Sequence, residues 1–191
     1  MTLISSCDRS EKSSKNLPVQ QVAQLISFCL MKLEKCQWCG LETPESDGPV
    51  HRYLGGTPGC WAHYGKLLAR EYENYDYMVV HGLTVDAYAL QHPGEKSLPA
   101  TRSTYIHLAS LFSYFELKRS ISQLAGIKQA IATHKLSDEW LIPPTELDGI
   151  NVDDVLTAQT AQQHRQSVEA WARYIFECWA PHHEKITHLI A

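Results

Sequence analysis

The feature that most constrains the fold is a pair of short motifs, Cys36-Gln-Trp-Cys39 and Cys60-Trp-Ala-His63. In each motif two soft donors stand three residues apart, so that one tight turn can direct both at a single ion. The chain between the motifs is long enough to bring them together. The spacing therefore predicts a tetrahedral zinc (Zn2+) site, and it indicates a bound metal more strongly than any other pattern indicates a reaction.

Three ligands of this predicted site are cysteines, and two histidines compete for the fourth position. His63 has the expected spacing from Cys60, whereas His51 lies on a predicted short strand and could take its place. Four protein donors would close the shell and give zinc a structural role. Three cysteines and a water would leave the site open to chemistry. A further alternative is that the four residues coincide by chance and their thiols bind nothing.

Composition and charge narrow the class of protein. With 191 residues, 44% hydrophobic residues and a formal net charge of −4, the chain has the balance of one soluble globular domain. That charge gives no reason to expect nucleic-acid binding, and no apolar run is long enough to span a membrane. The N-terminal stretch lacks the pattern of a signal peptide, which predicts a cytoplasmic protein whose cysteines favour metal over disulfide.

The hydrophobic pattern predicts a mostly helical fold. We expect a tail over residues 1–16 and a single helical domain over residues 17–191, with the zinc module at about residues 36–65. Helices are expected over residues 17–35, 59–72, 75–91, 101–135 with a break at Gly126, 151–156, and 161–190 with an end or a kink at Pro181, and a strand over 50–54. Thr57-Pro58 is a good helix start, and Asn151 is a good cap for the helix over 151–156. A knuckle, a short hairpin and a helix in this order form a treble clef. The predicted fold class is a helical bundle with a treble-clef-like zinc module.

A second group of residues could form a catalytic or metal site within the bundle. Its candidates are His81, Asp86, His92 and His107. Facing helices of a bundle can gather such side chains around one ion or one acid–base centre. No pair among them has the spacing that fixes two ligands at once, and Asp86 lies well around the helix from His81. A buried histidine with one satisfied hydrogen bond is the commoner outcome for such positions.

Five segments form a wider pattern: Cys36-x2-Cys39-Gly40, Asp47-Gly-Pro-Val-His51-Arg-Tyr53, Pro58-Gly-Cys-Trp61, Leu68-Ala-Arg-Glu-Tyr72 and His81-x-Leu-Thr-Val-Asp-Ala-Tyr88-x2-Gln-His-Pro-Gly94. This pattern resembles an uncharacterised family of small bacterial proteins, a domain of unknown function, which also matches the chain loosely from Trp171 to His183. The resemblance strengthens His51 as a fourth ligand relative to His63. The pattern also includes His81, Asp86 and His92 of the second group, but the resemblance implies no reaction.

Two functional hypotheses follow. In the first, the chain is a helical protein with structural zinc that binds an unidentified protein or small-molecule partner. In the second, it is a metal-dependent or acid–base enzyme that uses His81, Asp86, His92 and His107 beside the zinc module. Nucleic-acid binding through the module is disfavoured, because its basic residues are offset by nearby acids.

Overall fold

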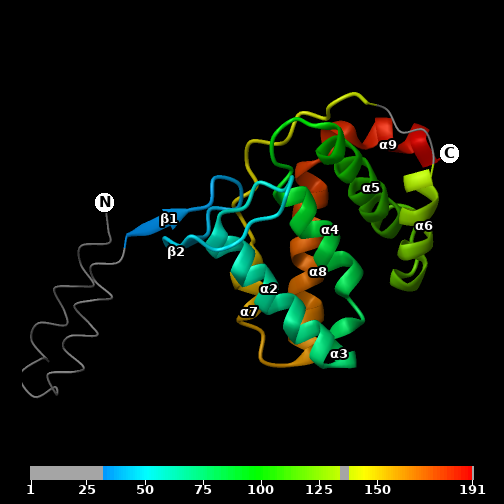
Figure 1. Ribbon diagram of the computed structural model, residues 1–191. Helices are drawn as coiled ribbons and strands as arrows, with labels where there is room; N and C mark the ends of the chain where they lie inside the picture. Colours follow the sequence, from blue (N-terminus) through cyan, green and yellow to red (C-terminus); the bar gives the residue numbers. More distant parts are fainter. Residues whose placement is uncertain (1–31, 134–137, 191) are drawn as a thin grey trace, which may run out of the picture. The chain divides into compact units, whose positions relative to one another are not determined.

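The computed structural model describes residues 32–133 and 138–190 of the chain (Figure 1). Residues 34–191 form one compact unit. The tail expected over residues 1–16 and most of the helix expected over 17–35 lie outside the described residues. The mostly helical fold class is confirmed, with a short antiparallel hairpin near a Cys3His group.

The hairpin differs in position from the one that the sequence predicts. Strands β1 (Leu33–Lys35) and β2 (Glu42–Pro44) pair with each other, so the expected helix does not continue through Lys35. The turn between the strands holds the first two cysteines, and residues 50–54, expected as a strand, are irregular. The knuckle is therefore the turn of the hairpin itself, because the amide of Cys36 donates to the carbonyl of Leu41 across it.

Helix α2 (Pro58–Glu73) begins and ends close to the predicted bounds. Thr57 is its N-cap, and Pro58 occupies a first-turn position where a missing amide hydrogen costs nothing. Its buried residues recur at three- and four-residue steps: Gly59, Cys60, Tyr64, Leu67 and Glu71. This stripe faces the rest of the helices and includes one carboxylate.

The single helix expected over residues 75–91 is divided into α3 (Tyr75–Met78) and α4 (His81–Gln91). Eight of the eleven residues of α4 are buried. The helix packs against α5 (Leu98–Phe115) and α8 (Ala161–Cys178), and Figure 1 shows it within the bundle. A helix so enclosed can carry polar residues only if they find partners inside the protein.

The long helix expected over residues 101–135 is also two helices, α5 and α6 (Ile121–Thr133). The chain turns between them at Lys118, whose φ is 55°. Gly126, where the sequence suggested a break, lies inside α6. Helix α7 (Val152–Leu156) begins after an Asn151 capping box, and at Pro181 the last helix gives way to η2 (Ala180–His182) and α9 (His183–Ile190).

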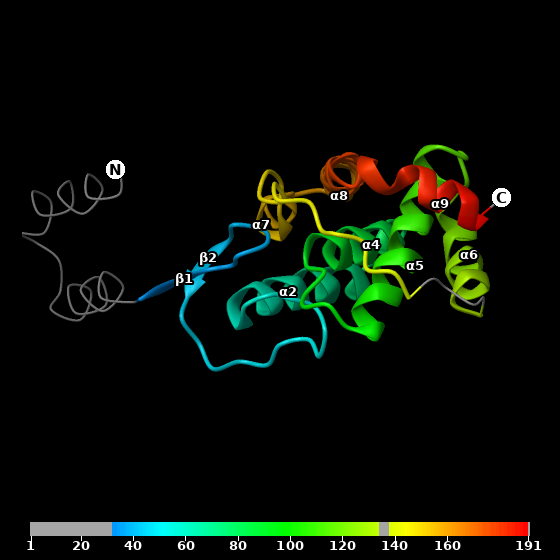
Figure 2. The same ribbon diagram turned by 90° about the horizontal axis from the view of Figure 1, so that it is seen from above.

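The core lies where α4, α5 and α8 meet. Its largest fully buried side chains include Trp171 and Trp179 of the α8 region, Tyr88 of α4 and Leu108 of α5. Both views place the hairpin and the start of α2 at one end of the unit, and α6 and α9 at the other (Figures 1 and 2). No helix in the described part of the chain is long and apolar enough to cross a membrane.

Candidate metal centre

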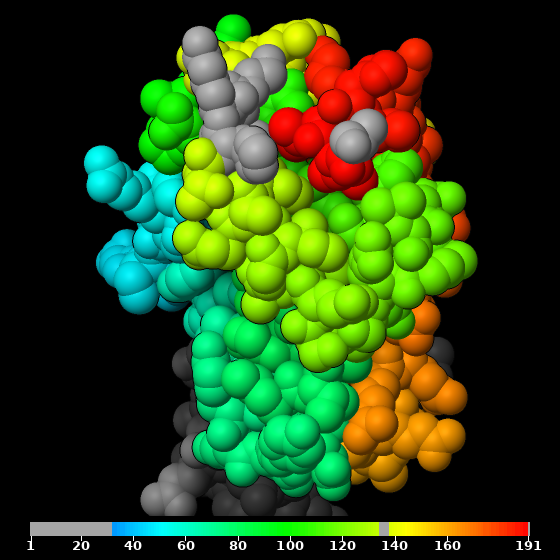
Figure 3. Space-filling model, turned by 90° about the vertical axis from the view of Figure 1, so that its right-hand side faces the viewer, coloured from blue at the N-terminus to red at the C-terminus, as the bar shows by residue number. Residues whose placement is uncertain are grey.

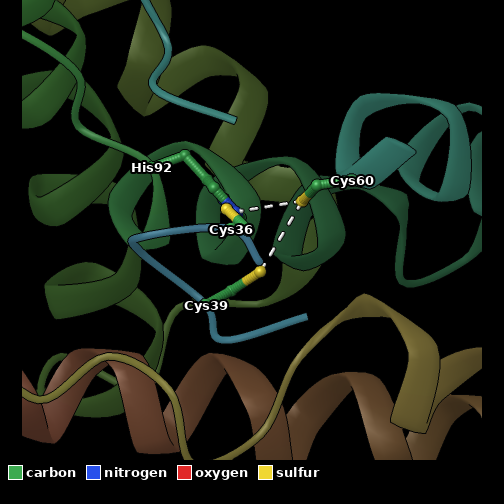
Figure 4. A group of neighbouring side chains, drawn as sticks. All are labelled: Cys36, Cys39, Cys60 and His92. Carbon is green, nitrogen blue, oxygen red and sulfur yellow. Dashed lines mark hydrogen bonds between the residues drawn. The ribbon is translucent and has the colours of Figure 1, made fainter. Parts of the chain in front are cut away.

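Four side chains converge beneath the hairpin: Cys36, Cys39, Cys60 and His92 (Figure 4). All four residues have a relative exposure of 0%, and their donor atoms all lie within 4.8 Å of one another. Among the described residues this is the one group of at least three such side chains that could hold a metal ion. The three cysteines come from the two motifs that the sequence singled out.

Cys36 and Cys39 are positioned by the tight turn between β1 and β2. The amide of Gly40 donates to the carbonyl of Cys36 at 3.0 Å, and the amide of Cys36 donates to the carbonyl of Leu41 at 2.8 Å. Gly40 has a φ of 72°, in the left-handed region that glycine enters at least cost. The turn therefore needs glycine after the second cysteine, and it points both thiols to the same side.

Cys60 lies in the first turn of α2. Its amide donates to the hydroxyl oxygen of Thr57 at 3.3 Å, which fixes the helix start. Cys60 thus contributes a donor from a rigid element, 3.6 Å from the sulfur of Cys39.

His92 follows the last residue of α4 and has its orientation fixed. Its Nδ1 lies 2.9 Å from the carbonyl oxygen of Tyr88; since a carbonyl only accepts, Nδ1 donates. Nε2 is then the ring nitrogen that can coordinate a metal ion, and it lies 3.3 Å from Sγ of Cys60. A ring nitrogen held by a backbone carbonyl is how a metal-binding histidine is usually oriented.

The chain around His92 is also held to the module. The amide of Gly55 donates to the carbonyl of His92 at 3.1 Å. Gly94 has a φ of 69°, and a Cβ there would collide with the carbonyl of Tyr53. The close approach of these two loops requires glycine and holds the end of α4 against the module.

The distances fit a tetrahedral ion. Bonds of about 2.3 Å to sulfur and 2.0–2.1 Å to nitrogen place two sulfurs roughly 3.8 Å apart, and a sulfur and a nitrogen roughly 3.5 Å apart. The observed separations are 3.6 Å for Cys39–Cys60 and 3.3 Å for Cys60–His92. The donor set, its burial and its spacing therefore fit a metal ion.

The electrostatics of the group favour a cation. Hydrogen bonds from Cys39 and Cys60 lower the pKa of Cys36 far below its ordinary value, although burial opposes this. Burial also disfavours the imidazolium form of His92, but its hydrogen bonds to Cys36 and Cys60 outweigh burial and raise the pKa of His92 to about 9. A buried thiolate is stabilised by a neighbouring positive charge, which a metal ion or a protonated imidazole can supply.

An aromatic layer covers the sulfur of Cys60. The hydroxyl of Tyr88 lies 3.5 Å from this sulfur, and burial together with the charge of Cys60 raises the pKa of Tyr88, which keeps the hydroxyl protonated. Tyr64 stacks on Tyr88 with ring centroids 3.8 Å apart, and Trp61 packs beside both. The hydroxyl can therefore donate to the thiolate while the rings exclude water from it.

Both histidines predicted as fourth ligands lie outside the group. Nδ1 of His63 lies 2.9 Å from Oδ1 of Asp153. His63 lies about 4.5 Å further along the helix axis than Cys60, and its side chain points about 60° away around the helix. His63 therefore faces α7, while Cys60 faces the hairpin. Nδ1 of His51 accepts from the amides of Tyr53 and Leu54, at 3.4 and 3.3 Å.

The four candidates for a second site are separated by the fold. His92 joins the cysteines, and His81 donates through Nδ1 to Oε2 of Glu71 at 2.8 Å. Asp86 and His107 do come together, with Oδ1 2.7 Å from Nδ1. The same carboxylate also accepts from Ser110 at 2.6 Å and from Lys128 at 3.0 Å.

Glu71 is a buried carboxylate that the sequence analysis did not select. It accepts hydrogen bonds from Thr84 at 2.5 Å, His81 at 2.8 Å and His164 at 3.0 Å. Burial alone would raise the pKa of Glu71, but these three hydrogen bonds outweigh it and lower the pKa. Its place on the buried stripe of α2, seven residues after Tyr64, is the signal that could have revealed it.

Comparison with known proteins assigns the chain to one protein family. The model of a family of unknown function matches residues 34–180, which include Cys36, Cys39, Cys60 and His92, the candidate metal-binding group. Neither the curated proteins nor the solved structures give a match.

Proposed function

Since the chain belongs to this family of unknown function, DUF5946, we propose its role from the site itself: one zinc ion held by Cys36, Cys39, Cys60 and His92 in a structural centre. The observation that carries this proposal is the convergence of four fully buried soft donors from three separate segments. The module so formed supports a protein that acts by binding a partner or a small ligand.

Zinc suits this donor set better than other common metals. Hard cations such as magnesium and calcium prefer oxygen ligands, whereas three thiolates and one imidazole in a tetrahedron are a usual structural zinc set. Four protein donors leave no position for water, so the ion would hold structure and activate nothing. His92 replaces His63 and His51 as the proposed fourth ligand.

The proposed zinc would join three separate parts of the chain. They are the turn of the hairpin, the first turn of α2 and the end of α4. A knuckle, then a helix that carries the next cysteine in its first turn, supports the treble-clef reading of the module. Unpaired thiols at such a centre suit the reducing cytoplasm of a bacterial cell, the location that we propose.

An acid–base enzyme is the second candidate, and the contact between Asp86 and His107 is the observation in its favour. A carboxylate that fixes the tautomer of a histidine is a common way to prepare a general base. However, Lys128 and Ser110 share the same carboxylate. A buried carboxylate satisfied from three sides is the pattern of a structural network, so the scaffold role is preferred.

Metal analysis of the purified protein and matched variants tests the proposal. We expect one zinc per chain in the wild type and in His63→Ala and His51→Ala. Cys36→Ser and His92→Ala should lose it, because each removes one of four donors. Loss of zinc in His63→Ala with retention in His92→Ala would contradict the proposed ligand set, and a metal-free wild type would refute the centre altogether.

A further inference from the structure

A cavity lies at the far end of the unit from the metal centre, among α5, α6 and α9. Its volume is about 350 Å³, within the range typical of small-molecule sites. Figure 3 looks onto this face, where α6, the corner between α5 and α6, and the C-terminal helix meet. The lining residues are Leu117, Ile127, Ala130, Ile131, Leu189 and Ile190, with Ser113 and Arg119.

The lining of the cavity has a simple chemistry. Six of its eight residues are aliphatic, no aromatic or acidic side chain contributes, and Arg119 is the one charged residue. Such walls favour an unbranched hydrocarbon chain, which gains free energy for each methylene that leaves water. The single arginine favours an anionic group at one end of that chain.

The corner between α5 and α6 brings Leu117 and Arg119 to the cavity. Lys118, between them, has a φ of 55°, a left-handed backbone conformation that is unfavourable for an L-residue with a side chain. The amide of Arg119 donates to the carbonyl of Ser113 at 3.0 Å, and Lys118 donates to the carbonyl of Phe115. These two bonds hold a strained turn whose neighbours on both sides line the cavity.

The guanidinium of Arg119 has no ion pair or hydrogen bond with any residue in the described parts of the chain. The first turn of α6, which begins two residues later, carries no acidic residue. In the described parts of the chain, therefore, no carboxylate pairs with the positive charge at this end of the cavity. An anionic ligand would supply the missing partner.

We propose that this cavity binds an unbranched aliphatic carboxylate of about ten carbons, with its chain against the aliphatic walls and its carboxylate on Arg119. At roughly 30 Å³ for each non-hydrogen atom, the cavity has room for about twelve such atoms, which is the size of decanoate. The inference rests on the proposed ligand-binding role and names the class of ligand.

Isothermal titration of the full chain with decanoate, below its micellar concentration, tests the inference. We expect saturable binding of one decanoate per chain, with decanol at least about tenfold weaker because it lacks the charge. Arg119→Gln should weaken decanoate about tenfold and leave decanol unchanged. Ala130→Trp should abolish both, because the indole would fill the cavity.

Arg102→Gln is the matched control, since Arg102 is an exposed arginine of α5 outside the cavity. It should bind decanoate as the wild type does. Absence of decanoate binding by the wild type, equal affinity for decanoate and decanol, or an unchanged affinity in Arg119→Gln would overturn the proposal. Zinc content measured on the same samples separates the two proposals, because loss of ligand binding with one zinc per chain leaves the metal centre standing.

Discussion

The module around the metal-binding group and the helical body are held together differently. The module, residues 33–60, contains two three-residue strands and an irregular stretch from residue 45 to residue 57. Apart from its cysteines, Leu41 is its only buried hydrophobic residue. The helical body, residues 61–133 and 138–190, buries whole side chains such as Trp171, Leu108 and Leu111. Where apolar burial is this small, a cross-link must supply the stability.

The two regions also treat buried polar groups differently. In the module the three sulfurs and the imidazole of His92 point at one another, and hydrogen bonds from Cys39 and Cys60 lower the pKa of the Cys36 thiol. In the body the buried carboxylates of Glu71 and Asp86 are each satisfied by three protein hydrogen-bond donors. These two carboxylates thus find their partners within the protein, whereas the sulfurs of the module are arranged to receive an ion from outside.

Removal of the metal should have the largest effect, and it should fall on the module. Structural zinc contributes about 10–16 kcal/mol of binding free energy in small metal-folded peptides. In Cys36→Ser we expect amide hydrogen exchange of residues 33–57 to approach that of unfolded chain. Helix content by circular dichroism should change little. The same result is expected when a chelator removes the metal from the wild type.

Cys178→Ser is the control for this variant, because Cys178 lies outside the metal-binding group. It should keep both the zinc and the slow exchange of the module. If Cys36→Ser unfolded the whole protein, with loss of helix content as well as of protection in the module, the module and the helical body would not be independently stable.

A substitution that creates a cavity in the core of the helical body should have the next largest effect. Leu108 has a relative exposure of 0%, so Leu108→Ala removes buried methyl groups and should lower the free energy of unfolding by about 2–5 kcal/mol. Urea titration followed by circular dichroism measures the change. The folded variant should keep one zinc per chain; a loss of zinc without unfolding would show that body packing sets the metal site.

The smallest predicted effect concerns the buried carboxylate of Glu71. Glu71→Gln should lower the free energy of unfolding by roughly 1–3 kcal/mol at neutral pH, because its hydrogen-bond donors lose a charged acceptor. Since the folded protein lowers the pKa of Glu71 below 4.5, its contribution is full above that pH and is lost as the pH falls through the folded pKa. The difference between variant and wild type should therefore shrink on acidification below about pH 4.5.

Glu73→Gln, two residues further along α2, is the exposed control and should change stability by less than about 0.5 kcal/mol. A stability difference for Glu71→Gln that grew on acidification would contradict the assigned charge state.

Sequence reasoning located three members of the metal-binding group because cysteine spacing is a local signal. Cys36 and Cys39 lie in one turn. Cys60 lies in the first turn of a helix whose start is indicated by Thr57 and Pro58. His92 lies 32 residues from Cys60, and only the packing of α4 brings it to the sulfurs. The three-residue spacing from Cys60 favoured His63 instead. No sequence pattern shows that the side chain of His63 contacts Asp153.

The fold class was also predictable, but several element bounds were not. Thr57-Pro58, Asn151 and Pro181 gave correct signals because they act within one turn of the chain. The breaks before His81 and around Lys118 carry neither proline nor glycine, and they depend on how the flanking helices pack. The partners of Glu71 and Asp86 come from two other helices each, so they too depend on the fold.

X-ray absorption at the zinc edge, on the wild type and two cysteine variants, tests the central claim most directly. We predict three sulfurs at about 2.3 Å and one imidazole nitrogen at 2.0–2.1 Å in the wild type. His92→Cys should convert this shell to four sulfurs, and His63→Cys should leave it unchanged. A shell that gains its fourth sulfur in His63→Cys, or a wild-type shell without three sulfurs, would contradict the account.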